Sequence, residues 1–169
     1  VVLVNDILLF CTIFDTVSHN GKSIGEVRAF EELKVQESSD VADIFSMKIE
    51  QFDEQRALTR GVWYMTKRIL RQFMLRSRAG RIINISSVVG HVGNAGQIPY
   101  TMEKAALDAF TRSLAQELRG RNILVNSVAP GFIETEMTQE LPEEVKSKIM
   151  ASIILNRIGL PEEVAEVVA

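Results

Sequence analysis

Two short apolar runs, RIINIS at residues 81–86 and NILVNSV at residues 122–128, do most to limit how this chain can fold. Each lies between turn-forming residues and has the length and composition of a strand buried on both faces. The segment between them, residues 100–119, carries apolar residues at helical spacing: Ala106, Phe110, Leu114 and Leu118. Strand, helix and strand in this order indicate an α/β fold with parallel strands and a right-handed crossover.

A leading helix is predicted over residues 54–76, where apolar residues recur at steps of three and four: Leu58, Val62, Met65, Ile69 and Phe73. Farther along, Pro142 predicts the start of a helix that runs to about Ile153, and Pro161 opens a last helix. These elements continue the alternation of an α/β domain.

The N-terminal part of the sequence lacks this alternation of helices and strands. Residues 1–14 are mostly apolar and predict a buried strand or two, because the run is too short to span a bilayer and lacks the features of a signal peptide. Residues 15–45 are polar, with one short helix predicted over residues 24–35. We therefore divide the chain into a divergent N-terminal segment, residues 1–45, and the α/β part, residues 46–169.

Composition excludes several classes of protein. Of the 169 residues 46% are hydrophobic, enough to fill a core, and a formal net charge of -3 gives no electrostatic signal for nucleic acid or an anionic membrane. The single cysteine, Cys11, forms no internal disulfide, which favours a reducing compartment. Together with His19 and His91 it gives no zinc-ligand spacing, so no metal site is expected.

The predicted topology brings several polar residues to one edge of the sheet. Ser87 follows the first strand and Pro130-Gly131 follows the second, so both lie at the carboxyl ends of parallel strands, where ligands bind in such folds. The helix between the strands must begin at the same edge, and its first residues include Tyr100 and Lys104.

Tyr100 and Lys104 are four residues apart and share a helix face. A free tyrosine has a pKa of about 10, too high for easy proton exchange at neutral pH. A neighbouring ammonium favours the phenolate and lowers that pKa, so the pair can act as a general acid and base beside Ser87. The pair alone is weak evidence, since it also suits a solvated helix face.

The wider context carries a resemblance. Four stretches of the sequence resemble the short-chain dehydrogenase/reductase family: GRIINISSVVG (80–90), GNAGQIPYTMEKAAL (93–107), SLAQELRGRNILVNSVAPGFIETEMT (113–138) and GLPEEVAEVV (159–168). Within the family they are most similar to the reductases that act on 3-oxoacyl groups carried by acyl carrier protein.

The resemblance implies a function and roles for particular residues. It implies NADPH-dependent reduction of a 3-oxoacyl thioester on acyl carrier protein, in fatty-acid synthesis. Ser87 would orient the substrate carbonyl, Tyr100 would donate the proton, and Lys104 would hold the nicotinamide ribose. The residues implied to contact the nicotinamide end are, besides Tyr100 and Lys104, Pro130, Gly131, Ile133 and Thr135. Arg78 and Arg121 match basic positions that receive the acidic carrier protein, although both also suit solvated element ends.

Some family features have no counterpart here. The glycine-rich turn that cradles the cofactor pyrophosphate is not matched, because Gly21 and Gly25 lack the third glycine and the preceding threonine. Ala57 stands near the position of the catalytic asparagine. The expected fold is a Rossmann-like doubly wound parallel sheet without the N-terminal cofactor-binding βαβ units and the last strand.

Two functions stay open from the sequence. The first is the reductase, weak or inactive as this chain because the pyrophosphate-binding turn is missing. The second is an incomplete or divergent relative without catalysis that acts through helix-helix association. We expect a homo-oligomer, a dimer or tetramer, formed through helices 54–76 and 100–119. These helices carry more apolar surface than one sheet face can cover, including Trp63, Phe73, Met74, Ala109 and Leu114. The resemblance implies the cytoplasm in a bacterium, or the plastid or mitochondrial matrix in a eukaryote.

Overall fold

A pair of parallel strands forms the centre of the protein. The computed structural model describes residues 18–19, 22–23, 44–45, 47–135, 138 and 141–169. Strand β3 (Gly80–Ile85) pairs with β4 (Ile123–Val128) in parallel, with register from Gly80 opposite Ile123 to Ile85 opposite Val128. Helix α4 (Ile98–Glu117) connects them. The predicted strand, helix and strand are confirmed, and the fold is α/β.

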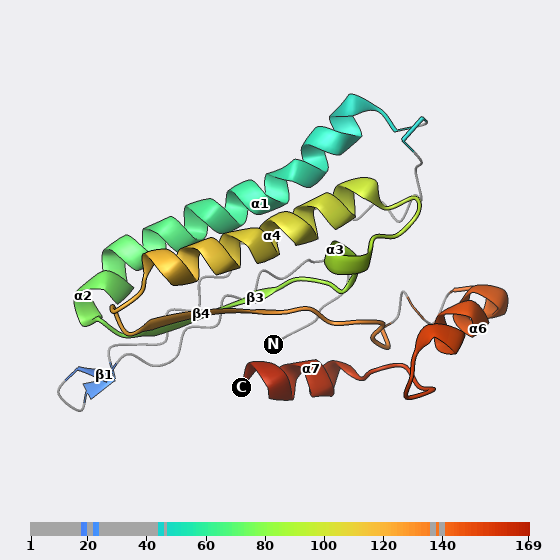
Figure 1. Cartoon of the computed structure of the whole chain (residues 1–169). Coiled ribbons are helices and arrows are strands. Elements are labelled where there is room, and N and C mark those ends of the chain that lie inside the picture. Colours follow the sequence, from blue (N-terminus) through green and yellow to red (C-terminus); the bar gives the residue numbers. More distant parts are fainter. Residues whose placement is uncertain (1–17, 20–21, 24–43, 46, 136–137, 139–140) are drawn as a thin grey trace.

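Two long helical elements cover one face of this sheet. Helix α1 (Ile49–Ile69) continues through a π-helical turn (Leu70–Met74) into α2 (Leu75–Ser77), and the resulting rod runs beside α4 above the strands (Figure 1). The rod begins before the predicted residue 54. It ends at Arg78, which adopts the left-handed conformation (φ 52°) that commonly terminates helices.

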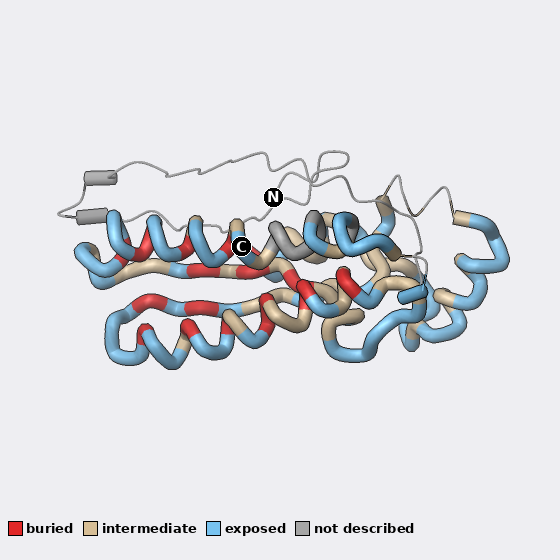
Figure 2. The backbone as a smooth tube through the Cα atoms, turned by 90° about the horizontal axis from the view of Figure 1, so that it is seen from above, coloured by how far each residue is buried: buried red, intermediate tan, exposed pale blue. Residues whose placement is uncertain are grey.

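The core lies between the rod, α4 and the strands. It is made of buried aliphatic side chains from all four elements: Ile69, Leu70, Met74, Ile82, Leu114, Leu118, Ile123 and Val125. Figure 2 shows that the buried positions face inward from each helix and strand, whereas the outer helix surfaces are exposed. Burial of these aliphatic groups is the main force that holds the helices on the sheet.

The π-helical turn changes which residues of the rod are buried. A π turn takes one more residue than an α turn, so the positions after Ile69 rotate relative to a regular helix. Leu70 and Met74 therefore enter the core, and Phe73 is 44% exposed. Val62 and Ile69 are buried as their spacing predicts, whereas Phe73, which continues that spacing, is exposed for this reason. Met74, expected to add to the apolar surface for association, is buried instead.

The inner face of α4 is more polar than the sequence pattern suggests. Leu114 and Leu118 are buried as predicted, but Ala106 and Phe110 are only half-buried. The positions fully buried on this helix include charged and polar residues: Glu103, Lys104, Asp108 and Thr111. The loop expected between the strand and α4 also contains a short helix, α3 (Val89–Val92).

The remaining described elements are small. Helix α6 (Glu143–Ser152) begins directly after Pro142, and helix α7 (Pro161–Val168) begins at Pro161, as predicted. Strand β1 (Ser18–His19) pairs with β2 (Lys22–Ser23) in antiparallel orientation. The strands expected in residues 1–14 and the helix expected at residues 24–35 lie outside the described residues. No helix in the described part has the length and apolar character needed to cross a membrane.

Candidate active site

The backbone ties the end of β3 to the segment after β4. The Ser86 N–H donates to the Val128 carbonyl at 2.7 Å, and the Val88 N–H donates to the Pro130 carbonyl at 3.0 Å. Ser87 stands between these two bonds. The structure thus brings Ser87 and Pro130 to the same carboxyl edge of the sheet, as the topology predicts.

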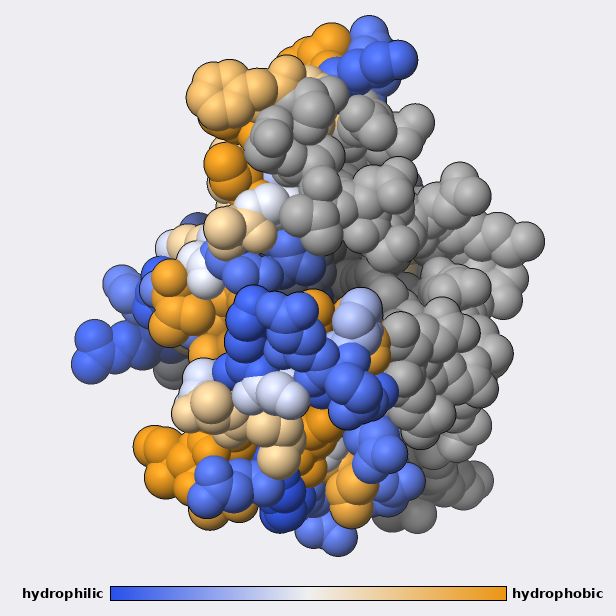
Figure 3. Space-filling view, turned by 90° about the vertical axis from the view of Figure 1, so that its right-hand side faces the viewer, coloured by the Kyte–Doolittle hydropathy of each residue, from blue (hydrophilic) through white to orange (hydrophobic). Residues whose placement is uncertain are grey.

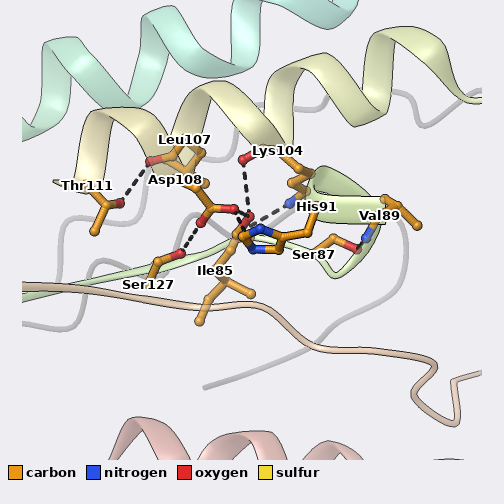
Figure 4. Close-up of polar contacts among 10 residues, drawn as sticks. Ile85, Ser87, Val89, His91, Lys104, Leu107, Asp108, Thr111 and Ser127 are labelled. Carbon is orange, nitrogen blue, oxygen red and sulfur yellow. Dashed lines mark hydrogen bonds and ion pairs between the residues drawn. The ribbon is translucent and has the colours of Figure 1, made fainter. Parts of the chain in front are cut away.

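The Ser87 hydroxyl is placed at the start of α3. The Val89 N–H approaches its Oγ at 3.4 Å, so the hydroxyl is the acceptor in this long contact (Figure 4). A hydroxyl has one proton and two acceptor lone pairs. The contact therefore uses an acceptor site of the Ser87 hydroxyl and leaves its O–H free to donate a hydrogen bond elsewhere.

Lys104 reaches the same strand end from α4. Its side chain donates from Nζ to the Ile85 carbonyl at 3.2 Å, and the residue is only 3% exposed. The same Nζ lies 5.4 Å from the centre of the Tyr100 ring, within the range of a cation–π contact. Tyr100 and Lys104 therefore share one face of α4, and Lys104 on this face contacts Ile85, the last residue of β3.

Polar contacts continue along α4 for two more turns. Asp108, one turn after Lys104, accepts hydrogen bonds from Ser86 Oγ at 2.8 Å and Ser127 Oγ at 2.6 Å (Figure 4). Farther on, Asn84 Nδ2 donates to Thr111 Oγ1 at 2.8 Å. The helix face that starts at Tyr100 is thus bonded to the ends of both strands.

Helix α4 is also held to α1 by a buried carboxylate. Glu103 accepts hydrogen bonds from the Thr59 N–H at 3.0 Å and from the Thr59 hydroxyl. Glu103 is buried and precedes Lys104 directly. Contacts on two sides, to α1 and to the strands, therefore fix the position of the turn that carries Lys104.

The loop after β4 contains the other residues implied to contact a cofactor. A Cβ built on Gly131 would meet nothing within 4 Å, so the main chain there is open. Ile133 forms a β-bridge with Gly159, and the Thr135 N–H donates to Thr138 Oγ1 at 2.8 Å. The open main chain and the Lys104 ammonium fit the nicotinamide-ribose end of a dinucleotide, whereas the described residues offer no glycine-rich turn for its pyrophosphate.

Arg78 and Arg121 lie at the opposite edge of the sheet. Arg78 precedes β3 and Arg121 precedes β4, and the first residues of these strands, Gly80 and Ile123, are paired. Both arginines are exposed. The structure therefore brings the two arginines to one end but does not bring them to Ser87, because the length of the strands separates the two edges.

A shallow groove of about 470 Å³ runs between α4 and β4. It is lined by residues of α3, α4 and the β4 segment: His91, Asp108, Thr111, Arg112, Ala115, Gln116, Val125, Asn126, Ser127 and Ala129. Neither Tyr100 nor Ser87 lines it. No group of histidine, cysteine and acidic side chains suited to a metal ion occurs among the described residues.

Comparisons of the sequence with known proteins identify its family. A family model described as "Enoyl-(Acyl carrier protein) reductase" matches residues 35–169. The chain belongs to the short-chain dehydrogenase/reductase family. Among curated relatives, a 3-oxoacyl-(acyl-carrier-protein) reductase from Aquifex aeolicus is 57% identical over 108 residues, which cover 64% of this chain and 43% of the relative.

Two other relatives span different shares of the chain. A 3-oxoacyl-(acyl-carrier-protein) reductase from Chlamydia pneumoniae is 39% identical over 160 residues, covering 89% of this chain and 64% of the relative. The nodulation protein G of Rhizobium meliloti is 51% identical over 105 residues, 62% of this chain and 42% of that protein. The matches thus span about half of the relatives' own length.

Sequence reasoning missed the cluster around Asp108. The signal that could have found it is a polar stripe at helical spacing, residues 100, 104, 108 and 111, opposite serines that end both strands. The prediction of the α4 inner face counted only apolar residues and so passed over it.

Proposed function

We propose that this short-chain dehydrogenase/reductase chain carries the catalytic site of an NADPH-dependent reductase of 3-oxoacyl thioesters. The observation that supports it best is the arrangement of Lys104: buried, bonded to the last residue of β3, and one turn from Tyr100. A solvated helix face would not bury an ammonium in this way, because removing a charge from water is costly without a specific partner.

The proposed roles follow from these contacts. Ser87 donates a hydrogen bond to the carbonyl oxygen of the substrate and orients it. The Tyr100 hydroxyl gives its proton to that oxygen as the carbonyl becomes an alcohol. The Lys104 ammonium stabilises the phenolate left on Tyr100, since a nearby positive charge favours the deprotonated phenol.

The cofactor would rest on the residues of this same edge. Lys104 and Tyr100 would hold the nicotinamide ribose, and the loop from Pro130 through Gly131 and Ile133 to Thr135 would contact the nicotinamide. When bound, NADPH supplies the hydride that reduces the carbonyl carbon. The choice of NADPH over NADH rests on the family resemblance.

The surface around the site suits an acyl chain. Val92, Ile98 and Met102 lie in or next to the segment between α3 and Tyr100, and all three are well exposed. Figure 3 looks onto the end of the molecule at which the strands terminate, where hydrophobic and hydrophilic surface alternate. Apolar side chains beside a proton donor fit a substrate that joins an acyl chain to a ketone.

Arg78 and Arg121 support docking of an acidic carrier protein. Six residues of strand at about 3.3 Å each separate them from Ser87 by about 20 Å. A carrier docked at these arginines would have to deliver its acyl group over this distance. The proposed homo-oligomer would form through the outer faces of α1 and α4, where exposed Trp63 and Phe73 of the rod contribute apolar area.

NADPH oxidation with acetoacetyl-coenzyme A as the 3-oxoacyl thioester tests the proposal. We expect weak turnover by the 169-residue chain, and its loss by about 10²- to 10⁴-fold in Tyr100→Phe. Tyr64→Phe is the matched control, because Tyr64 has Arg68 over its ring and lies away from the strand ends. Equal turnover in the two variants would reject the assignment of Tyr100.

The alternative is a relative that acts only by helix-helix association. The exposed aromatic residues of α1, Trp63 and Tyr64, favour it. Titration of Trp63 fluorescence with NADPH separates the two functions: a saturable change supports the reductase, and no response up to millimolar NADPH supports the alternative.

The remaining assignments extend this proposal. Residues 1–45 would form a segment apart from the reductase part, residues 46–169. The reductase would work in the cytoplasm of a bacterium, or in the plastid or mitochondrial matrix of a eukaryote, in fatty-acid synthesis.

A further inference from the structure

The buried side chain of Asp108 contacts three other side chains. Its side chain is 6% exposed, and each of its carboxylate oxygens receives a serine hydroxyl, Ser127 on Oδ1 and Ser86 on Oδ2. The Nε2 of His91 lies 3.2 Å from Oδ2. Three segments, β3, β4 and α3, thus converge on one residue of α4.

The contact with Ser86 differs from the contact with Ser127. Ser86 Oγ also lies 3.1 Å from the Lys104 carbonyl, so its single proton has two acceptors within reach. The carboxylate is closer and carries charge, which makes it the stronger acceptor. Asp108 thereby holds the Ser86 side chain against the turn of α4 that carries Lys104.

This contact connects the two halves of the proposed site. Ser86 precedes Ser87 in the chain, and Lys104 lies one turn from both Tyr100 and Asp108 on α4. The distance between the serine and the tyrosine depends on how α4 sits on the end of β3. Ser127, in contrast, joins Asp108 to β4, and its connection to Ser87 runs only through the main chain, by way of Val128, whose carbonyl accepts from the Ser86 N–H.

We propose that Asp108 is a positioning residue: through Ser86 it fixes the strand end that carries Ser87 against the helix turn that carries Lys104 and Tyr100. The proposal rests on the proposed reductase function. It also predicts that the two serines differ. Loss of Ser86 should affect catalysis, whereas loss of Ser127 should affect mainly stability, although its hydrogen bond is the shorter of the two.

The test compares Ser86→Ala, Ser127→Ala and Asp108→Asn in the full chain. We expect Ser86→Ala and Asp108→Asn to lower kcat by about ten- to a hundredfold, with KM for NADPH unchanged, because misplacement of a reacting group by about 1 Å can cost about a hundredfold. Ser127→Ala should keep kcat within about twofold and lower the thermal midpoint at least as much as Ser86→Ala.

Amide hydrogen exchange gives a second readout that does not depend on turnover. The Val88 N–H, bonded to the Pro130 carbonyl, reports the strand end. In Ser86→Ala and Asp108→Asn it should exchange about tenfold faster relative to the interior of β3, and in Ser127→Ala it should not.

The outcomes separate the two proposals. A wild-type chain without turnover would count against the reductase, and the exchange of Val88 would still decide the role of Asp108. If kcat and Val88 exchange change equally in both serine variants, in proportion to lost stability, Asp108 is only structural and the inference is overturned.

Discussion

Gly90 lies directly against the main chain of Lys104: a β-carbon at position 90 would stand 3.1 Å from the Lys104 carbonyl carbon and 3.0 Å from the Ala105 nitrogen. Both atoms belong to a helix backbone, which cannot move aside as the end of a side chain can. The close approach of α3 to α4 therefore requires glycine at this position.

The first prediction concerns Gly90→Ala. In an open helix the change would stabilise the protein by about 0.5–1 kcal/mol, because glycine is a poor helix former. Here we expect destabilisation by about 1–3 kcal/mol through overpacking, together with lower turnover as the Lys104 turn shifts. Chemical denaturation measures the effect. A more stable Gly90→Ala protein would contradict the close packing of α3 on α4.

The second prediction concerns Ser87→Ala. Loss of a hydrogen bond to the developing oxyanion costs on the order of 3 kcal/mol, so kcat should fall by about a hundredfold. Thermal stability should change little, because the one hydrogen bond of the Ser87 side chain within the described part of the chain is the long contact with the Val89 N–H. Ser113→Ala, an exposed change on α4, serves as the control. Equal kcat in the two variants would remove Ser87 from the site.

A third prediction compares two buried threonines. Thr66 Oγ1 is buried without a hydrogen-bond partner among the residues the structure describes, so Thr66→Val should raise the free energy of unfolding by about 1 kcal/mol. Thr111 Oγ1 accepts from Asn84 and donates to the Leu107 carbonyl, so Thr111→Val should lower it by about 1–3 kcal/mol. Urea denaturation of both variants should give opposite signs.

The fourth prediction concerns the link between α4 and α1. Glu103→Ala leaves the partly buried Thr59 N–H and hydroxyl without their acceptor and should lower the free energy of unfolding by about 1–3 kcal/mol. Glu143→Ala, which removes an exposed pair with Lys146, should cost less than about 1 kcal/mol. Similar losses in the two variants would show that the Glu103 contact adds little.

The fifth prediction is a pH dependence at the start of α7. Glu163 accepts two bonds from Arg157 and one from the Leu160 N–H, and these contacts lower its pKa from 4.5 to about 2. A lowered folded-state pKa means that the contribution to stability is complete above about pH 4.5 and is lost as the pH falls toward 2.

NMR titration of the Glu163 carboxyl group should show this low pKa, and added salt should raise it, since the pair is exposed. Glu163→Gln should remove the acid dependence of the amide shift at Leu160. An ordinary glutamate pKa at Glu163 would contradict the paired geometry.

Much of this architecture could be predicted from local patterns. The strands at residues 80–85 and 123–128 follow from apolar runs between turn signals, and the four-residue spacing of Tyr100 and Lys104 places them on one face whatever surrounds the helix. Ser87 reaches the same edge because parallel strands end together. These features depend only on periodicity and topology.

Other features depend on tertiary context and could not be predicted in this way. Phe73 turned outward because one residue is absorbed in a π turn, which apolar spacing does not indicate. The burial of Glu103 and Asp108 depends on Thr59, Ser86 and Ser127 from other segments. Burial of a charged side chain becomes favourable only when such partners are in place.

The polar stripe on α4 has a consequence for how the helix chooses its place on the sheet. Leucine and isoleucine side chains specify the alignment of helix and sheet less strictly than hydrogen-bonding groups do, because dispersion contacts are not directional. Displacement of the helix by one turn would move Asp108 away from its serines and Thr111 away from Asn84, leaving several buried polar groups without partners. Hydrogen bonding thus selects a single alignment of helix and sheet. Aliphatic replacements along the stripe would still pack α4 on the sheet but would no longer specify that one alignment.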